Sequence, residues 1–125
     1  MTAAGRLSKA EQFFEAAETI RNLADDEEEV GDAYVTLCVH AGVAAADVIC
    51  CVALKEHAQG DDHHQALALL ARVRPGGTEL AKSLAPLLGM KTRAGYSFWP
   101  VTNDNRKRAR RHAERLLRAA RERSR

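Results

Sequence analysis

The stretch YVTLCVHAGVAAADVICCVAL, from Tyr34 to Leu54, decides the fold of this chain. Its apolar residues recur at alternating spacings of four and three, so one helical stripe contains Val35, Val39, Gly42, Ala46, Ile49 and Ala53. A second stripe runs beside it, and a helix that is apolar on nearly all sides is buried by neighbouring elements. Thr36, His40 and Asp47 interrupt the apolar window, which argues against a membrane span. We expect the central helix of a soluble bundle.

The composition is that of one helical domain. The chain has 125 residues, of which 46% are hydrophobic and 5% aromatic. This length is close to the commonest domain size and is enough for one core. Alanine, leucine, glutamate and arginine, which are strong helix formers, dominate, and no run alternates as a half-buried strand would. We therefore predict an all-α, up-and-down bundle of four to five helices.

Capping residues place the expected helix starts. These N-caps or first residues are Ser8, Asp32, Asp62, Thr78 and Thr102. Ser8 and the glutamate three positions later form a capping box, so residues 1–7 are expected to be a flexible tail and 8–123 the bundle.

Three further sequence features bear on where the expected helices end or break. The central helix is expected to end near Gly60, and Pro86 to kink or restart the fourth helix, because proline lacks the backbone donor. Residues 91–101 are the least regular part and contain three of the six aromatic residues.

Charge is distributed unevenly along the chain, although the net charge is only +2. Residues 11–32 contain nine acids and one base, and residues 106–125 contain ten bases and two acids. The acidic run 25–29 would end one helix and basic residues would begin the last, so both oppose the helix dipole. The two ends could pair within a subunit, across a dimer, or with a charged partner.

The arginine-rich last helix is the candidate nucleic-acid interface. Clustered arginines bind phosphates through several donors each and release counterions. The candidate residues are Arg106, Lys107, Arg108, Arg110, Arg111 and Arg115. A solvated basic face is the alternative. Phe98 and Trp99 could stack on bases or could cover the open end of the bundle.

A carboxylate inside the apolar central helix needs a partner. For Asp47 the candidate partners are Lys91, Arg93 and Tyr96, which would form a buried polar cluster with it. This cluster is either a structural ion pair that holds the loop or the lining of a polar groove.

Cysteine and histidine patterns indicate no metal and no cofactor. Cys38, Cys50 and Cys51 all lie in the central helix, without a C-x-x-C pair, which is typical of reduced thiols in a cytoplasmic protein. The adjacent His63 and His64 lack the spacing of metal-binding helices and fit a helix start instead.

Several segments taken together resemble the HEPN superfamily, in particular small actinobacterial HEPN-like proteins. These are AGVAAADVICC in the central helix, GDDHHQALALL after it, and K-x-x-A-x-Y at Lys91, Ala94 and Tyr96. The resemblance covers about residues 8 to 122 and implies a helical bundle that often dimerises. It also implies binding or cleavage of RNA, and membership of toxin–antitoxin or phage-defence systems.

Catalytic members of that family carry an arginine and a histidine that cleave RNA without a metal at a dimer cleft. Arg106 and His112 match this spacing in the present chain. The resemblance thus implies His112 as general acid/base and Arg106 as the group that stabilises the phosphorane. Immediately before Tyr96 no histidine is present, so an enzymatic activity is left open.

Three function classes remain. The leading one is a HEPN-like, RNA-directed nucleic-acid module, dimeric and cytoplasmic, with possible metal-independent ribonuclease activity. The second is a non-catalytic interaction subunit, antitoxin-like or scaffold, whose charged ends dock a protein partner encoded nearby. The third is a sequence-independent DNA-binding protein.

Overall fold

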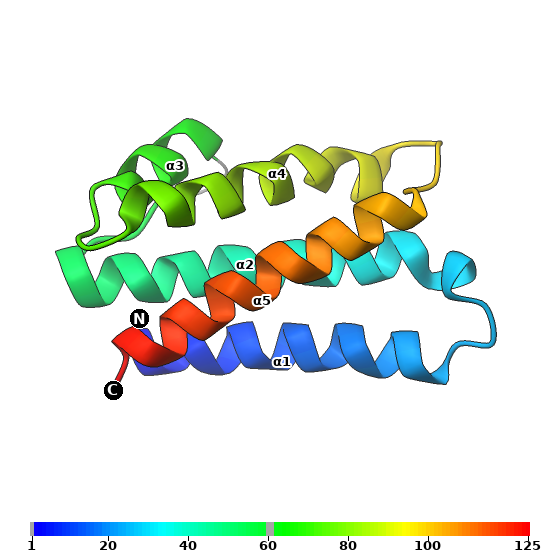
Figure 1. Ribbon diagram of the computed structural model, residues 1–125, viewed down its shortest axis with the longest axis horizontal. Coiled ribbons are helices and arrows are strands. Elements are labelled where there is room, and N and C mark those ends of the chain that lie inside the picture. Colours follow the sequence, from blue (N-terminus) through cyan, green and yellow to red (C-terminus); the bar gives the residue numbers. More distant parts are fainter. Residues whose placement is uncertain (1, 60–61) are drawn as a thin grey trace.

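Helices make up nearly all of the chain (Figure 1). The structure, a computed structural model, describes residues 2–59 and 62–125. Within these ranges there are five α-helices, one 3-10 helix and no strand: α1 (Ala3–Leu23), η1 (Glu27–Val30), α2 (Gly31–Leu54), α3 (His63–Ala71), α4 (Gly77–Tyr96) and α5 (Asn103–Arg123). The predicted all-α bundle is confirmed.

The apolar helix α2 is the centre of the bundle, as predicted. Figure 1 shows α1 below it, α4 above it and α5 crossing in front of it. The residues that α1 buries are small, namely Ala10 and Ala17, and α5 presents three alanines and two leucines. Small side chains let helix axes approach closely. Gly42 serves the same purpose, because a Cβ atom there would collide with the buried Leu87 side chain of α4.

One segment has the length and hydropathy of a membrane span. It runs over Glu27–Leu54 and so includes η1 and all of α2. Most of its apolar part is buried inside the bundle, where core helices have the same composition.

The first helix begins earlier than the capping box predicts. Thr2 is its N-cap and accepts a hydrogen bond from the Gly5 backbone N–H at 3.0 Å. Ser8 lies inside α1, where its hydroxyl accepts from the Gln12 side chain. The prediction of a flexible tail was therefore wrong from Ala3 onward, because these residues are helical. Met1 lies outside the described residues.

The acidic run does not oppose a helix dipole. Helix α1 ends at Leu23, and Asp26 caps η1 by accepting from the Glu28 backbone N–H at 2.9 Å. The glutamates of the run consequently lie in the first turn of η1. Negative charge is favourable at that end of a helix.

Two other helix boundaries differ from the prediction. Helix α2 ends at Leu54, because Lys55 adopts a left-handed conformation with φ of 61°, and the expected end at Gly60 lies outside the described residues. Helix α4 begins after Gly76, whose φ is 84°, instead of at a Thr78 cap. It then continues through Pro86 without restarting, as far as Tyr96.

The predicted caps of α3 and α5 are confirmed. The Asp62 carboxylate accepts from the Gln65 N–H at 3.0 Å, and the Thr102 hydroxyl accepts from the Asn105 N–H at 3.1 Å. Asp32, in the first turn of α2, also accepts from the Val101 N–H at 2.9 Å. This bond fixes the start of α5 against the start of α2.

Candidate nucleic-acid interface

The outward face of α5 forms a shallow basic groove. The helix turns its alanines and leucines toward α2, so its long charged side chains face away from the core. Five cations and one carboxylate line a groove of about 350 Å³, here called the α5 groove: Lys107, Arg110, Arg111, Glu114, Arg115 and Arg118. Four of the six predicted binding residues lie in it.

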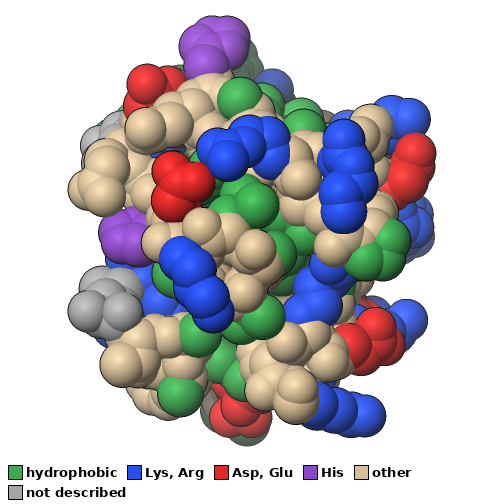
Figure 2. Space-filling view, turned by 90° about the vertical axis from the view of Figure 1, so that its left-hand side faces the viewer, with side chains coloured by type: hydrophobic (Ala, Val, Ile, Leu, Met, Phe, Trp, Pro, Cys, Tyr) green, Lys and Arg blue, Asp and Glu red, His purple; other side chains and the backbone are tan. Residues whose placement is uncertain are grey.

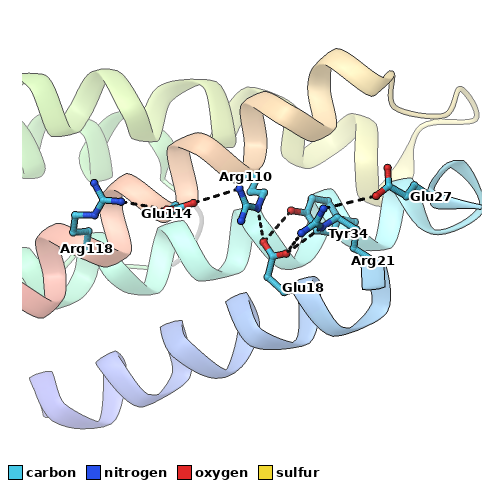
Figure 3. Close-up of polar contacts among 7 residues, drawn as sticks. All are labelled: Glu18, Arg21, Glu27, Tyr34, Arg110, Glu114 and Arg118. Carbon is cyan, nitrogen blue, oxygen red and sulfur yellow. Dashed lines mark hydrogen bonds and ion pairs between the residues drawn. The ribbon is translucent and has the colours of Figure 1, made fainter. Parts of the chain in front are cut away.

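Some of the α5 arginines are neutralised by carboxylates of the same chain (Figure 3). Arg110 pairs with Glu18 of α1 at 2.6 Å, and Arg118 pairs with Glu114 at 3.2 Å. Nearer the C-terminus, Arg121 pairs with Glu11 of α1 at 3.1 Å. Of the alternatives left open for the charged ends, pairing within one chain occurs for Arg110 and Arg121, through carboxylates of α1 and not through the acidic run.

The first half of α5 keeps its positive charge. Between residues 106 and 115, five side chains have no carboxylate partner among the described residues, and we call them the unpaired cations: Arg106, Lys107, Arg108, Arg111 and Arg115. Two of them donate to uncharged groups, Arg106 to the Asn103 amide and Arg115 to the Ser83 hydroxyl. The positive end of the helix dipole adds to this potential. Of the six predicted binding residues, Arg110 alone is neutralised.

Glu18 anchors Arg110 against α1. Its carboxylate accepts from Arg110 and Arg21, both at 2.6 Å, and lies 3.4 Å from the Tyr34 hydroxyl (Figure 3). Burial alone would raise the pKa of Glu18, but the hydrogen bonds and charges of Arg110 and Arg21 hold that pKa below its usual value. Glu18 is therefore ionised at neutral pH.

Arg106 and His112 are not brought together within one chain. Six helical positions correspond to about 600°, so their side chains leave α5 about 120° apart. Arg106 lies against Gly31 of α2, while His112 is near Arg108 and Arg115, on the side where Arg115 contacts Ser83 of α4.

His112 is half-buried, and its Nδ1 atom has no hydrogen-bond partner. Burial and the charges of Arg111, Arg108 and Arg115 lower its pKa. The imidazole is therefore neutral at pH 7.

Asp47 is buried as expected, but its predicted partners were largely wrong. Its carboxylate pairs with Arg6 at 3.3 Å, and Arg6 comes from the segment expected to be a tail. Arg93 instead donates to the Pro100 carbonyl, and Tyr96 is 83% exposed. Lys91 lines the same cavity of about 70 Å³ as Asp47. The four residues therefore do not form one cluster.

The sequence did contain a signal that Arg6 faces the core, where it meets Asp47. Arg6 precedes Ala10 by four positions, so it continues the inner stripe of α1 backward by one turn. The serine cap masked this continuation.

We expect Asp47→Asn to stabilise the protein at pH 7, by up to about 1 kcal/mol. Burial raises the pKa of Asp47, although Arg6 and His57 oppose the shift. Because the pKa of Asp47 is higher in the folded state, the protonated carboxyl contributes to the free energy of unfolding. This contribution is fully present below the unfolded-state pKa and is lost as pH rises through the folded-state pKa. The Arg6 side chain is 22% exposed, so the loss of its ion pair in the variant limits the gain.

Urea unfolding at pH 3 and pH 7 measures this effect. The gain in free energy of unfolding of the Asp47→Asn variant over the parent should increase with pH. The Asp25→Asn control, at an exposed position, should show no such gain. A variant less stable than the parent at pH 7 would mean that the Arg6 ion pair outweighs the desolvation of Asp47.

Other reactive side chains are arranged for structure. Burial raises the pKa of both Cys38 and Cys50 to about 12, so these thiols are protonated at neutral pH. Across residues 2–59 and 62–125, no three His, Cys, Asp or Glu side chains converge as metal ligands. Asp61, which shortly precedes the adjacent His63 and His64, lies outside the described residues.

The loop between α4 and α5 exposes large aromatic side chains. Phe98 is 93% and Trp99 68% exposed, and their rings meet edge to face at 6.0 Å. The alternative that they cover the end of the bundle is therefore wrong. Arg93 holds the loop through the Pro100 carbonyl, and the unpaired cations begin a few residues later. Exposed aromatic side chains of this kind can stack on unpaired bases.

The end of the molecule that contains both termini differs from the α5 groove. Figure 2 shows this end, where Lys and Arg side chains are scattered among acidic, hydrophobic and histidine side chains.

Comparison with known proteins adds no relative. No protein-family model matches the chain, and neither a curated protein nor a solved structure matches it significantly. The resemblance to HEPN proteins therefore stays a prediction.

Proposed function

We propose that this chain is a HEPN-like, RNA-directed binding module that holds a nucleic-acid backbone along α5. The observation that carries the proposal is the set of five unpaired cations between residues 106 and 115 of a single helix. Without an anion nearby, this arrangement is unfavourable, because the charges repel one another and the helix dipole. A phosphate backbone removes both penalties and releases counterions on binding.

The spacing of these cations suits an extended polyanion. Lys107, Arg111 and Arg115 follow one another at intervals of four residues, which places one cation about every 6 Å along α5. All three line the α5 groove. The exposed Phe98 and Trp99 favour RNA with unpaired bases over duplex DNA, because stacking requires an accessible base face.

Binding is better supported than cleavage. The implied catalytic pair, Arg106 and His112, leaves α5 on different sides, so a cleavage site would need a second copy of the chain to complete it. The orphaned Nδ1 of a neutral His112 is the one feature that favours chemistry.

A second candidate function is docking of a protein partner, in an antitoxin-like or scaffold role. The acidic run favours it, because Asp25, Glu28 and Glu29 are exposed and have no ion pair among the described residues. A basic partner, or α5 of a second copy in a homodimer, would complement this run.

Fluorescence anisotropy with a single-stranded RNA and a matched DNA separates these functions, with the RNA analysed on a gel afterwards. Salt-sensitive binding that favours RNA and leaves it intact supports the proposal. Cleavage that disappears in His112→Ala would add nuclease activity to it. No binding at low salt, together with a co-purifying protein partner, would favour the docking function instead.

We expect Glu18→Gln to strengthen RNA binding several-fold. The change removes the closest carboxylate of Arg110 and Arg21 and leaves each with one longer ion pair, to Glu114 and Glu27, so both cations become more available to phosphate. The salt dependence should become steeper by about one unit of slope. Anisotropy titrations of the variant and the parent measure both effects.

Glu15→Gln is the matched control, because Glu15 is exposed on the same helix and contacts no arginine among the described residues. An increase in affinity equal to that of the control would show that net charge alone, and not release of Arg110, is responsible.

A further inference from the structure

A small pocket lies where the ends of several helices meet. The last turn of α1, η1 and the first turns of α2 and α5 enclose a volume of about 120 Å³. Its charged and hydroxyl-bearing lining consists of Arg21, Glu27, Tyr34, Arg106, Lys107 and Arg110. We call it the α1–α5 pocket. Its volume corresponds to about four water molecules, which is on the scale of one phosphate group.

The charge of this pocket is positive by about two. The four cations of the pocket are Arg21, Arg106, Lys107 and Arg110. Two carboxylates lie beside them: Glu27 in the lining, and Glu18, which pairs with both Arg21 and Arg110 (Figure 3). Glu114 also approaches Arg110, at 3.6 Å, but it pairs with Arg118 as well. A phosphate monoester carries about −1.5 to −2 charges at pH 7 and therefore matches the excess.

Hydrogen-bond donors in the pocket are positioned and partly unused. Arg21 and Arg110 are held by Glu18, which fixes the directions of their guanidinium groups. Arg106 makes one hydrogen bond, to an uncharged amide, and Lys107 has no ion pair among the described residues. Arginine forks and a lysine point charge are the groups that recognise phosphate oxygens.

The pocket adjoins the α5 groove. Lys107 and Arg110 line both of them. Residues of η1 and of the end of α1 line the pocket on the side of the start of α5. A strand that follows the groove toward the start of α5 therefore reaches the pocket.

We propose that the α1–α5 pocket binds a phosphate monoester and that it receives the terminal phosphate of a strand lying in the α5 groove. The second half of this statement rests on the proposed function. A free mononucleotide offers the same chemical group, so the test must separate the two sources.

Four probes make this separation. They are one RNA sequence with a 5′-phosphate, with a 3′-phosphate and with hydroxyl groups at both ends, and adenosine monophosphate. We expect one phosphorylated RNA to bind about tenfold more tightly than the unphosphorylated RNA, because two charge-assisted contacts are gained.

Each pattern of affinities for the four probes supports or overturns one of the two proposals. Equal affinity for all three RNAs overturns the pocket proposal and leaves RNA binding intact. Binding of adenosine monophosphate without binding of any RNA supports a phosphate site but overturns the strand-end role and the proposed function together. No binding of any probe overturns both proposals.

Two variants exclude a general charge effect. Arg106→Gln removes a pocket cation that holds no carboxylate, so it should abolish the preference for the terminal phosphate. Arg111→Gln removes a cation that lines the groove but not the pocket, so it should weaken all RNAs and keep the preference. Equal loss of preference in both variants would overturn the proposal, and circular dichroism verifies that both fold.

Discussion

Replacing Lys107, Arg111 and Arg115 together by glutamine is expected to lower the affinity for single-stranded RNA about a hundredfold at low salt. The three residues form one row along α5, and none has a carboxylate partner among the described residues. Each exposed contact with a phosphate contributes about 1 kcal/mol, and about 3 kcal/mol corresponds to two decades in Kd. The slope of log K against log salt should become shallower by about 2.

The fold should survive this triple change, since glutamine is a good helix former and all three side chains are exposed. A matched control replaces three exposed cations outside α5, Lys9, Arg72 and Lys82, by glutamine. The control changes the net charge equally but should retain most of the affinity. If both triple variants lose RNA equally, binding would depend on net charge and not on the α5 groove.

Gly77→Ala is expected to destabilise the protein by about 3 kcal/mol, which is a large effect for one methyl group. Gly77 is buried at the start of α4, and a Cβ atom there would lie 2.5 Å from the Leu70 carbonyl oxygen and 2.9 Å from that of Ala71. Both oxygens belong to the backbone of α3, so no side-chain rotation can relieve the collision. The α3–α4 connection must move instead.

Thermal unfolding followed by circular dichroism measures this effect, with an expected decrease in Tm of about 10 °C. Gly89→Ala is the control in the same helix, because no atom lies within 4 Å of its Cβ position. That variant should gain about 0.5 to 1 kcal/mol from helix propensity. A Gly77→Ala variant as stable as the parent would contradict the close contact between α3 and α4.

The parts of the fold that local sequence could predict are those set by local chemistry. Helix α2 follows from its continuous apolar surface, and the starts of α3 and α5 follow from Asp62 and Thr102, which bond within their own first turn. The start of α4 was missed because a glycine in the left-handed region, Gly76, begins the helix without a side-chain cap. Ser8 resembled a start, but Thr2 takes that role.

In the candidate site, too, local sequence predicts some features, and others depend on how the helices pack. The composition of α5 identified its basic residues, but which of them remain unpaired depends on contacts distant in sequence. Arg110 and Arg121 are neutralised by Glu18 and Glu11, which precede them by 92 and 110 residues. The partner of Asp47 was likewise missed, because Arg6 reaches it only once α1 packs on α2. Such pairings require the packed bundle.

The salt dependence of RNA binding tests the central claim most directly, namely that the unpaired cations of α5 hold a phosphate backbone. Anisotropy titrations of one single-stranded RNA at several salt concentrations give the slope of log K against log salt. Five phosphate contacts predict a slope of about −3.5 for a single strand. A slope near zero, or no binding at the lowest salt, would contradict the claim.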